Sequence, residues 1–126
     1  MDEQTARRAI IAVMQMSPRL TYYGLDPAWN DDFQDNRRRL AGDGVEEFQR
    51  AVAWLARVPK RPVAGTDHDS QGLRHAAEDW SGDVIGNGAF IAAALHLGFP
   101  VEWVRGTHNA LIGVEAGAQW PRKKVA

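Results

Sequence analysis

The 126-residue chain contains no cysteine, which excludes disulfide bonds, thiol nucleophiles and zinc sites built on thiolates. It also lacks an excess of either charge: 15 Lys and Arg residues meet 16 Asp and Glu residues, and the formal net charge is −1. Such a chain has no global basic field, so charge alone does not predict non-specific binding to nucleic acid. No phosphate-cradling glycine motif, nucleophile elbow or paired-carboxylate spacing stands out, and we predict no cofactor and no bound metal.

Long hydrophobic runs are missing as well. The longest apolar segment, residues 89–95, is far shorter than the ~20 residues that a membrane-spanning helix needs, so we expect no membrane partner. Residues 1–4 are acidic and polar, unlike the basic and then apolar start of a secretory signal. These features favour a cytoplasmic protein.

The sequence does contain enough apolar material for one packed core. A length of 126 residues and an apolar fraction of 44% are usual for one globular domain, so we expect residues 1–126 to form a single domain. Residues 59–70 hold two prolines and a glycine, which indicates a surface loop. If the chain divides, it divides here, into a helical front half (1–58) and a helix–helix–hairpin unit (70–115).

Helical periodicity dominates the front half. Apolar residues recur at helical spacing in three segments, which predicts helices over 2–16, 26–40 and 43–55. Asp26-Pro27 has the pattern of a cap followed by proline at the first helical position, and Asp43 with Glu46 resembles a capping box. The aromatic stretch 20–25 is compatible with a packed loop or with a short strand.

The back half begins with two predicted helices. Asp69 is expected to cap a helix that starts near residue 70 and that Gly82 ends. Asn87 is expected to cap a second helix over 88–97, with Gly98 as its C-terminal glycine. This second helix is apolar nearly all round, so we expect it to be central and buried.

A hairpin is expected to follow, with strands at 101–105 and 110–114 around a turn at 106–109. The predicted fold class is therefore α+β and mostly helical, with a C-terminal helix-turn-helix plus β-hairpin in the order of a winged-helix domain. In that fold the second helix reads base edges with polar side chains. Residues 89–95 of the apolar helix have no polar side chains with which to read bases. Any contact with nucleic acid therefore has to come from the wing or from loops.

Histidine and carboxylate side chains suggest one candidate site for acid–base or metal chemistry. His75 and Glu78 lie three residues apart and share a helix face, where a carboxylate can orient a histidine as a base or a metal ligand. A surface or half-buried hydrogen bond is the alternative. A zinc site from His75, His96 and His108 is conceivable, although no spacing demands it.

Charged side chains suggest two candidate binding surfaces. An acidic, aromatic face is expected from Phe33 together with Trp29, Asp31, Asp32 and Asp35, which would suit a basic partner, unless the arginines at 37–39 compensate it. A local basic patch is expected from Arg57, Lys60, Arg61 and Arg74, unless these residues are simply solvated.

Part of the back half resembles a known sequence pattern. The segments are Gly72-Leu73-Arg74-His75-Ala76-Ala77-Glu78, then Asn87-Gly88-Ala89-Phe90-Ile91-Ala92-Ala93-Ala94, then Gly98-Phe99 and Asn109-Ala110. Together they resemble a largely uncharacterised family of small proteins from bacteria, phages and other mobile elements. The resemblance covers residues 70–115, implies no activity, and marks His75, Glu78, Asn87, Gly88 and Asn109 as polar candidates. The chain departs from the family pattern at Gln71, Arg74, Val84 and Gly86.

These observations predict a non-catalytic binding protein of phage or mobile-element origin, acting on nucleic acid or on a nucleoprotein complex. One alternative is a protein–protein inhibitor of a host defence system, of the anti-CRISPR type, acting through residues 26–35. A second alternative is a metal-dependent or acid–base enzyme built on His75 and Glu78.

Overall fold

The computed structural model has an α+β architecture with five helices and two antiparallel hairpins in the residues that it describes, 1–27, 31–115, 117 and 120–122. In chain order the elements are α1 (Glu3–Met16), β1 (Leu20–Thr21), β2 (Gly24–Leu25), α2 (Phe33–Leu40), α3 (Gly44–Leu55), α4 (Ser70–Ser81), α5 (Asn87–His96), β3 (Val101–Trp103) and β4 (Ala110–Ile112). None of the helices in these residues is both long enough and apolar enough to cross a bilayer.

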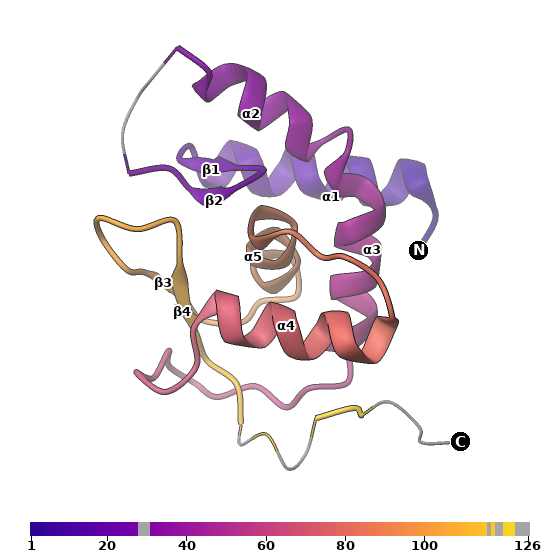
Figure 1. Cartoon of the computed structure of the whole chain (residues 1–126), viewed down its shortest axis with the longest axis vertical. Helices are drawn as coiled ribbons and strands as arrows, with labels where there is room; N and C mark the ends of the chain where they lie inside the picture. Colours follow the sequence, from indigo (N-terminus) through magenta and orange to yellow (C-terminus); the bar gives the residue numbers. More distant parts are fainter. Residues whose placement is uncertain (28–30, 116, 118–119, 123–126) are drawn as a thin grey trace.

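Helix α5 occupies the centre of the fold. It packs most extensively against α3, and also against α1 and α4, and Figure 1 shows it nearly end-on among them. Every residue from Asn87 to Ala94 is buried. Burial on all sides explains why this helix is apolar all round, and it confirms the prediction of a central helix.

The hydrophobic core joins the two halves of the chain. Ile10 of α1 and Trp54 of α3 belong to the same buried cluster as Phe90 of α5 and Ile112 of β4. The loop after α3 is also tied to the back half, because the Arg61 N–H donates to the Gly113 carbonyl at 2.9 Å and the Ile112 N–H donates to the His68 carbonyl at 3.1 Å. Residues 59–69 therefore run beside the strand β4 as a surface loop.

The predicted start of the second helix at Asp26-Pro27 is wrong, because α2 begins at Phe33. The stretch 20–25 forms the β1–β2 hairpin, with Leu20 opposite Leu25. The Asp26 N–H donates to the Arg19 carbonyl at 2.8 Å, which extends the hairpin to Asp26 and leaves this residue only 4% exposed. The local sequence pattern assigns Asp26 to a helix cap, but in the structure this residue belongs to the hairpin.

The predicted capping box at Asp43 is also wrong. Asp43 itself has helical backbone angles, φ −61° and ψ −28°, and its side chain makes no cap hydrogen bond. Its carboxylate accepts instead from Arg39 Nε at 3.0 Å, across the tight turn between α2 and α3. Asp69, in contrast, caps α4 as predicted by accepting from the Gly72 N–H at 2.8 Å, and Gly82 ends that helix with a φ of +79°.

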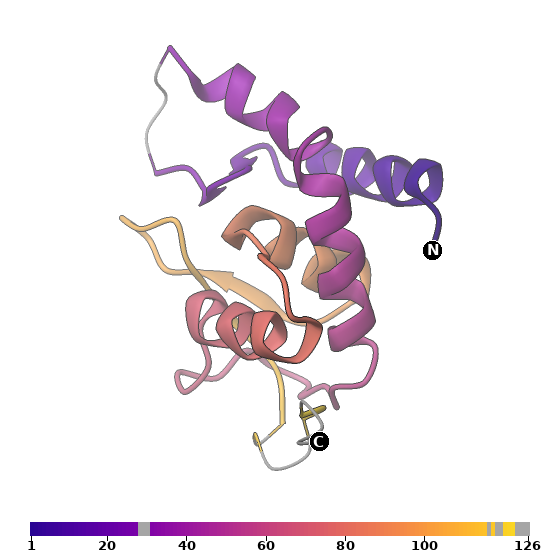
Figure 2. The same cartoon turned by 45° about the vertical axis from the view of Figure 1, so that its right-hand side comes forward.

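The C-terminal hairpin is shorter than predicted. Strands β3 and β4 pair from Val101 opposite Ile112 to Trp103 opposite Ala110, whereas the sequence predicts strands extending to 105 and 114. The connection between them reaches out on the side of the molecule where the β1–β2 hairpin and the start of α2 lie (Figures 1 and 2). The two hairpins thus come together beside α5.

Candidate functional site

Asn87 ties the two hairpins together. It is not the cap of α5 that the sequence predicts, because Gly86 takes that position and Asn87 is the first helical residue. Its side-chain Nδ2 lies 3.0 Å from the His108 carbonyl oxygen, 3.2 Å from Asn109 Oδ1 and 3.3 Å from the Tyr23 carbonyl oxygen. Asn87 is only 6% exposed, so this candidate residue acts as a buried link between β1–β2 and β3–β4.

Two glycines allow this close approach of the hairpins to α5. A Cβ on Gly88 would lie 1.9 Å from the Thr21 carbonyl oxygen, and a Cβ on Gly24 would lie 2.3 Å from the His108 carbonyl oxygen. Gly24 also has a φ of +120°, which residues with side chains rarely adopt. The Asn87-Gly88 pair therefore has a structural explanation. The Asn87 amide joins the two hairpins, and the lack of a side chain at Gly88 lets the β1–β2 hairpin lie close to α5.

Glu47 and Tyr22 secure the start of α5 from the other side. Glu47 is 8% exposed, and its two carboxylate oxygens accept from the Tyr22 hydroxyl at 2.8 Å and from the Gly86 N–H at 2.5 Å. Burial, and then the hydrogen bond to Glu47, raise the pKa of Tyr22 to about 12. The hydrogen bonds hold the β1–β2 turn and the α5 N-terminus against α3.

Glu78 holds the loop that leads into α5. Its Oε2 accepts from the Ile85 N–H at 2.9 Å, while Arg74 Nη1 lies 3.5 Å from both carboxylate oxygens and 3.3 Å from the Ile85 carbonyl oxygen. His75 Nδ1 lies 3.1 Å from Glu78 Oε1, but the His75 side chain is 65% exposed. These contacts support a structural role for Glu78, with His75 as a solvated neighbour.

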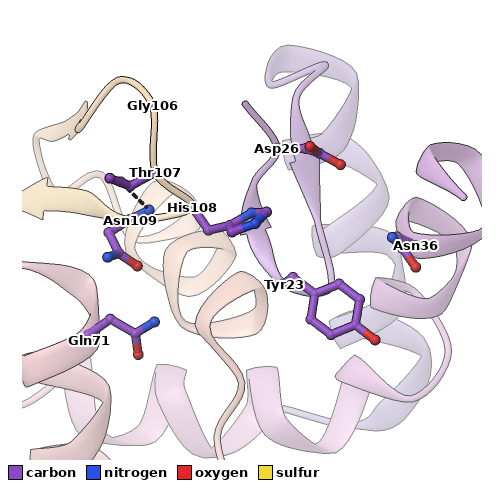
Figure 3. Close-up of a pocket in the computed structure, with 8 residues that line it drawn as sticks. All are labelled: Tyr23, Asp26, Asn36, Gln71, Gly106, Thr107, His108 and Asn109. Atoms are coloured by element: carbon purple, nitrogen blue, oxygen red, sulfur yellow. Dashed lines mark hydrogen bonds between the residues drawn. The ribbon is translucent and has the colours of Figure 1, made fainter. Parts of the chain in front are cut away.

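Beside this framework lies a groove of about 620 Å³ between the two hairpins, α2 and α4. We call it the hairpin groove, and its lining residues are Tyr23, Asp26, Asn36, Gln71, Gly106, Thr107, His108 and Asn109. Figure 3 shows Gln71 and Asn109 on one side, Tyr23 and Asn36 on the other, and His108 between them. Amide, hydroxyl, imidazole and phenol groups are suited to hydrogen bonding with a polar, planar ligand.

Tyr23 provides an aromatic surface in this groove. It is 48% exposed, and its hydroxyl accepts from Arg39 Nη1 at 2.8 Å. The ring of Tyr22 meets it edge-on with centroids 5.5 Å apart. The phenol is thus braced on two sides while a large part of it faces solvent.

Two arginines and a tryptophan lie next to the hairpin groove. The guanidinium carbons of Arg19 and Arg105 lie 5.8 Å and 5.2 Å from the ring centroid of Trp103, a cation–π geometry. Arg19 Nε also donates to the carbonyl of Asp26, and Trp103 Nε1 donates to the carbonyl of Thr107, both at 2.8 Å. Because both carbonyls belong to groove residues, the positive charges of Arg19 and Arg105 lie at the edge of the groove.

The acidic candidates lie in the first turn of α2 and just before it, and none of them lines the hairpin groove. Asp31, Asp32 and Asp35 are exposed, and Asp35 pairs with Arg38 on the surface of α2. The predicted aromatic part of this face is wrong for Phe33, which is 3% exposed and turned into the protein. Trp29 lies outside the described residues.

The basic candidates each make contacts within the chain. Arg61 binds both oxygens of Asp67 at 2.8 and 2.9 Å, and Arg74 donates to Gln71. Arg57 donates to the Ala53 carbonyl and stacks on Trp80, and Lys60 donates to the Leu97 carbonyl beside Phe99. These contacts compete with any external anion.

Metal chemistry finds no support in the described part of the chain, which contains no group of three or more His, Asp or Glu side chains that could hold an ion. His96, proposed as one of three zinc ligands, lies against the ring of Phe48 with centroids 5.6 Å apart. His108 lines the hairpin groove, and His75 stands on α4 beside Glu78.

Comparison with protein-family models, curated proteins and solved structures gave no significant match to this chain. The site is therefore defined by its geometry alone. Of the residues singled out from the sequence, His108 and Asn109 line the groove and Asn87 lies beneath it. Sequence reasoning did not predict Tyr23, Asn36 and Gln71 as groove residues, because they come from three elements that are distant in the sequence. The one sequence feature that pointed to this site was the polar turn 106–109 between two short strands.

Proposed function

We propose that the chain is a non-catalytic binding protein, of phage or mobile-element origin, that binds nucleic acid through the hairpin groove. The observation that carries this proposal is the groove itself, which places an exposed tyrosine among amide side chains with two arginines at its edge. Proteins that bind unpaired nucleic acid combine aromatic stacking surfaces with cationic groups along the backbone path.

The burial of α5 supports a role for the hairpins in this contact. The order α4, α5, β3–β4 is that of a winged-helix domain, in which the second helix enters the major groove. Here that helix is enclosed by α1, α3 and α4 and its residues 87–94 are buried, so they cannot reach the edges of bases. We assign recognition to the β3–β4 connection and to the β1–β2 hairpin opposite it.

Fluorescence anisotropy with labelled oligonucleotides at low and rising salt tests the proposal. We expect binding that weakens as the salt concentration rises. The slope of log K against log salt concentration should be shallow, because few cations stand at the groove. Arg105→Gln should reduce the slope by about 0.7 for a single strand, the value for one lost phosphate contact. Arg8→Gln is the matched control, since Arg8 is exposed on α1. Absence of binding at low salt, or equal effects of the two variants, would contradict the proposal.

The exposed carboxylates of Asp31, Asp32 and Asp35 favour a second function, a protein–protein inhibitor of a host defence system of the anti-CRISPR type. An acidic surface suits a partner that presents a basic one. If this function holds, replacing the three aspartates with lysine should abolish co-purification with a defence complex, whereas oligonucleotide binding should persist and gain strength from the added positive charge. A partner retained by the lysine variant would exclude this surface.

A further inference from the structure

The orientation of the Asn109 amide is set by the framework beneath the groove. Asn87 Nδ2 faces the backbone carbonyls of His108 and Tyr23, which can only accept hydrogen bonds, so the amide atom that faces them must be a donor. This identifies the nitrogen of the Asn87 amide and requires Asn109 to present its Oδ1 to that nitrogen, at 3.2 Å. The Nδ2 of Asn109 is therefore the end left for other partners.

Gln71 is oriented in the same way from α4. Its Oε1 accepts from Arg74 Nε, because a guanidinium can only donate. Neither Gln71 Nε2 nor Asn109 Nδ2 has an acceptor among the residues that the structure describes. Both amides lie on the same side of the groove in Figure 3, where Gln71 Nε2 points toward Tyr23 and Asn109 Nδ2 points away from it. Gln71 Nε2 is therefore the N–H donor that this wall presents to the groove.

Tyr23 stands across the groove from the Gln71 donor (Figure 3). A half-exposed ring braced by Tyr22 and Arg39 loses little conformational freedom when a planar ligand stacks on it. Every nucleobase has a π-face that can stack on an aromatic side chain. A base in this position would turn one edge toward Gln71 and Asn109.

We propose that the hairpin groove holds one unpaired nucleobase, stacked on Tyr23, and prefers bases whose edge presents carbonyl acceptors. This inference rests on the nucleic-acid function proposed above and names its ligand. Thymine and uracil offer a carbonyl oxygen at the position where cytosine carries an amino group, and that amino group would meet the N–H donor of Gln71. A duplex is excluded from this mode because its bases are stacked and paired.

Anisotropy titrations with oligo(dT), oligo(dC) and a duplex of the same length test the preference, and oligo(rU) and oligo(rC) extend it to RNA. We expect the full chain to bind oligo(dT) about tenfold more tightly than oligo(dC). The thymine carbonyl gains a hydrogen bond from the amide donor, whereas the cytosine amino group would face that donor with another donor. Gln71→Glu replaces the donor by an acceptor in the same shape, and should reverse the preference toward oligo(dC). Gln15→Glu adds the same charge on the exposed surface of α1 and should leave the preference unchanged.

The stacking partner is tested separately. Tyr23→Ala should weaken binding of every single strand about tenfold or more, whereas Tyr23→Phe should retain it, because stacking needs the ring and not the hydroxyl. Circular dichroism and thermal melting confirm that each variant is folded. Equal binding of oligo(dT) and oligo(dC), unchanged by Gln71→Glu, would overturn this inference and leave the proposed function standing. Failure of all strands and the duplex to bind would overturn both.

Discussion

At the scale of single residues, Gly88 is the glycine that leaves the least room for a side chain. A Cβ there would lie 1.9 Å from the Thr21 carbonyl oxygen and 2.6 Å from that of Tyr22, and backbone atoms cannot move aside without displacing the β1–β2 hairpin. We expect Gly88→Ala to lower the free energy of unfolding by about 2 kcal/mol or more, measured by urea denaturation. Gly42→Ala is the control, because its Cβ meets nothing closer than 3.7 Å; equal losses in both variants would contradict the explanation.

Tyr22 carries the residue-scale prediction for pH. Burial and the hydrogen bond to Glu47 raise the pKa of its hydroxyl from an ordinary 10.0 to about 12. A group whose pKa is raised in the folded state stabilises the fold below its unfolded pKa, and this contribution is lost as the pH rises from about 10 through about 12. We expect the free energy of unfolding to fall across this window, and to fall less in Tyr22→Phe. Parallel slopes in urea titrations of the two proteins would refute this.

At the scale of secondary-structure elements, Glu78 joins the end of α4 to the loop that starts α5. Its carboxylate accepts from the Ile85 N–H and lies between Arg74 and His75. We expect Glu78→Ala to destabilise the fold by about 1–3 kcal/mol, because it leaves the half-buried Ile85 N–H without its acceptor and removes the carboxylate that faces Arg74. His75→Ala should change stability by less than about 0.5 kcal/mol, since that side chain is 65% exposed. Chemical denaturation of the two variants separates these outcomes, and a fully stable Glu78→Ala would rule out the structural role.

Helix boundaries show at the same scale where local pattern succeeds and fails. Asp69 caps α4 because its own backbone is extended, with ψ of 166°, so its carboxylate faces the first turn. Asp43 has the same side chain but helical backbone angles, because the short turn from α2 leaves no extended residue. The difference lies in the path of the preceding chain, which the capping residue itself does not encode.

At the scale of the whole molecule, the arrangement of α5 inside a shell of α1, α3 and α4 predicts how the fold opens. The amides of Phe90, Ile91 and Ala92 are surrounded by core side chains, and these residues are 0% exposed. We expect their hydrogen exchange to be the slowest in the protein and to require global unfolding. Exchange of α5 that is faster than exchange of α1, followed by mass spectrometry or NMR, would show that the core opens locally around its central helix.

Much of the helical framework follows from the sequence alone. The spacing of Ala6, Ile10 and Val13, with Asp2 before them, predicts α1 within one residue of its observed start. The uniformly apolar composition of residues 89–94 predicts a buried helix, because such a segment has no polar face to turn toward water. These features are local or depend on burial in general, and they need no knowledge of which element packs on which.

The groove was decided by tertiary structure. Tyr23, Gln71 and Asn109 are far apart in the sequence, and only the packing of both hairpins against α5 brings them together. Tertiary contacts also decide the role of each polar residue: the same amide chemistry makes Asn87 a buried link and leaves Asn109 Nδ2 without an acceptor among the described residues. A side chain's hydrogen-bonding capacity is a property of its residue type, but which of its atoms remains available depends on the neighbours that the fold supplies.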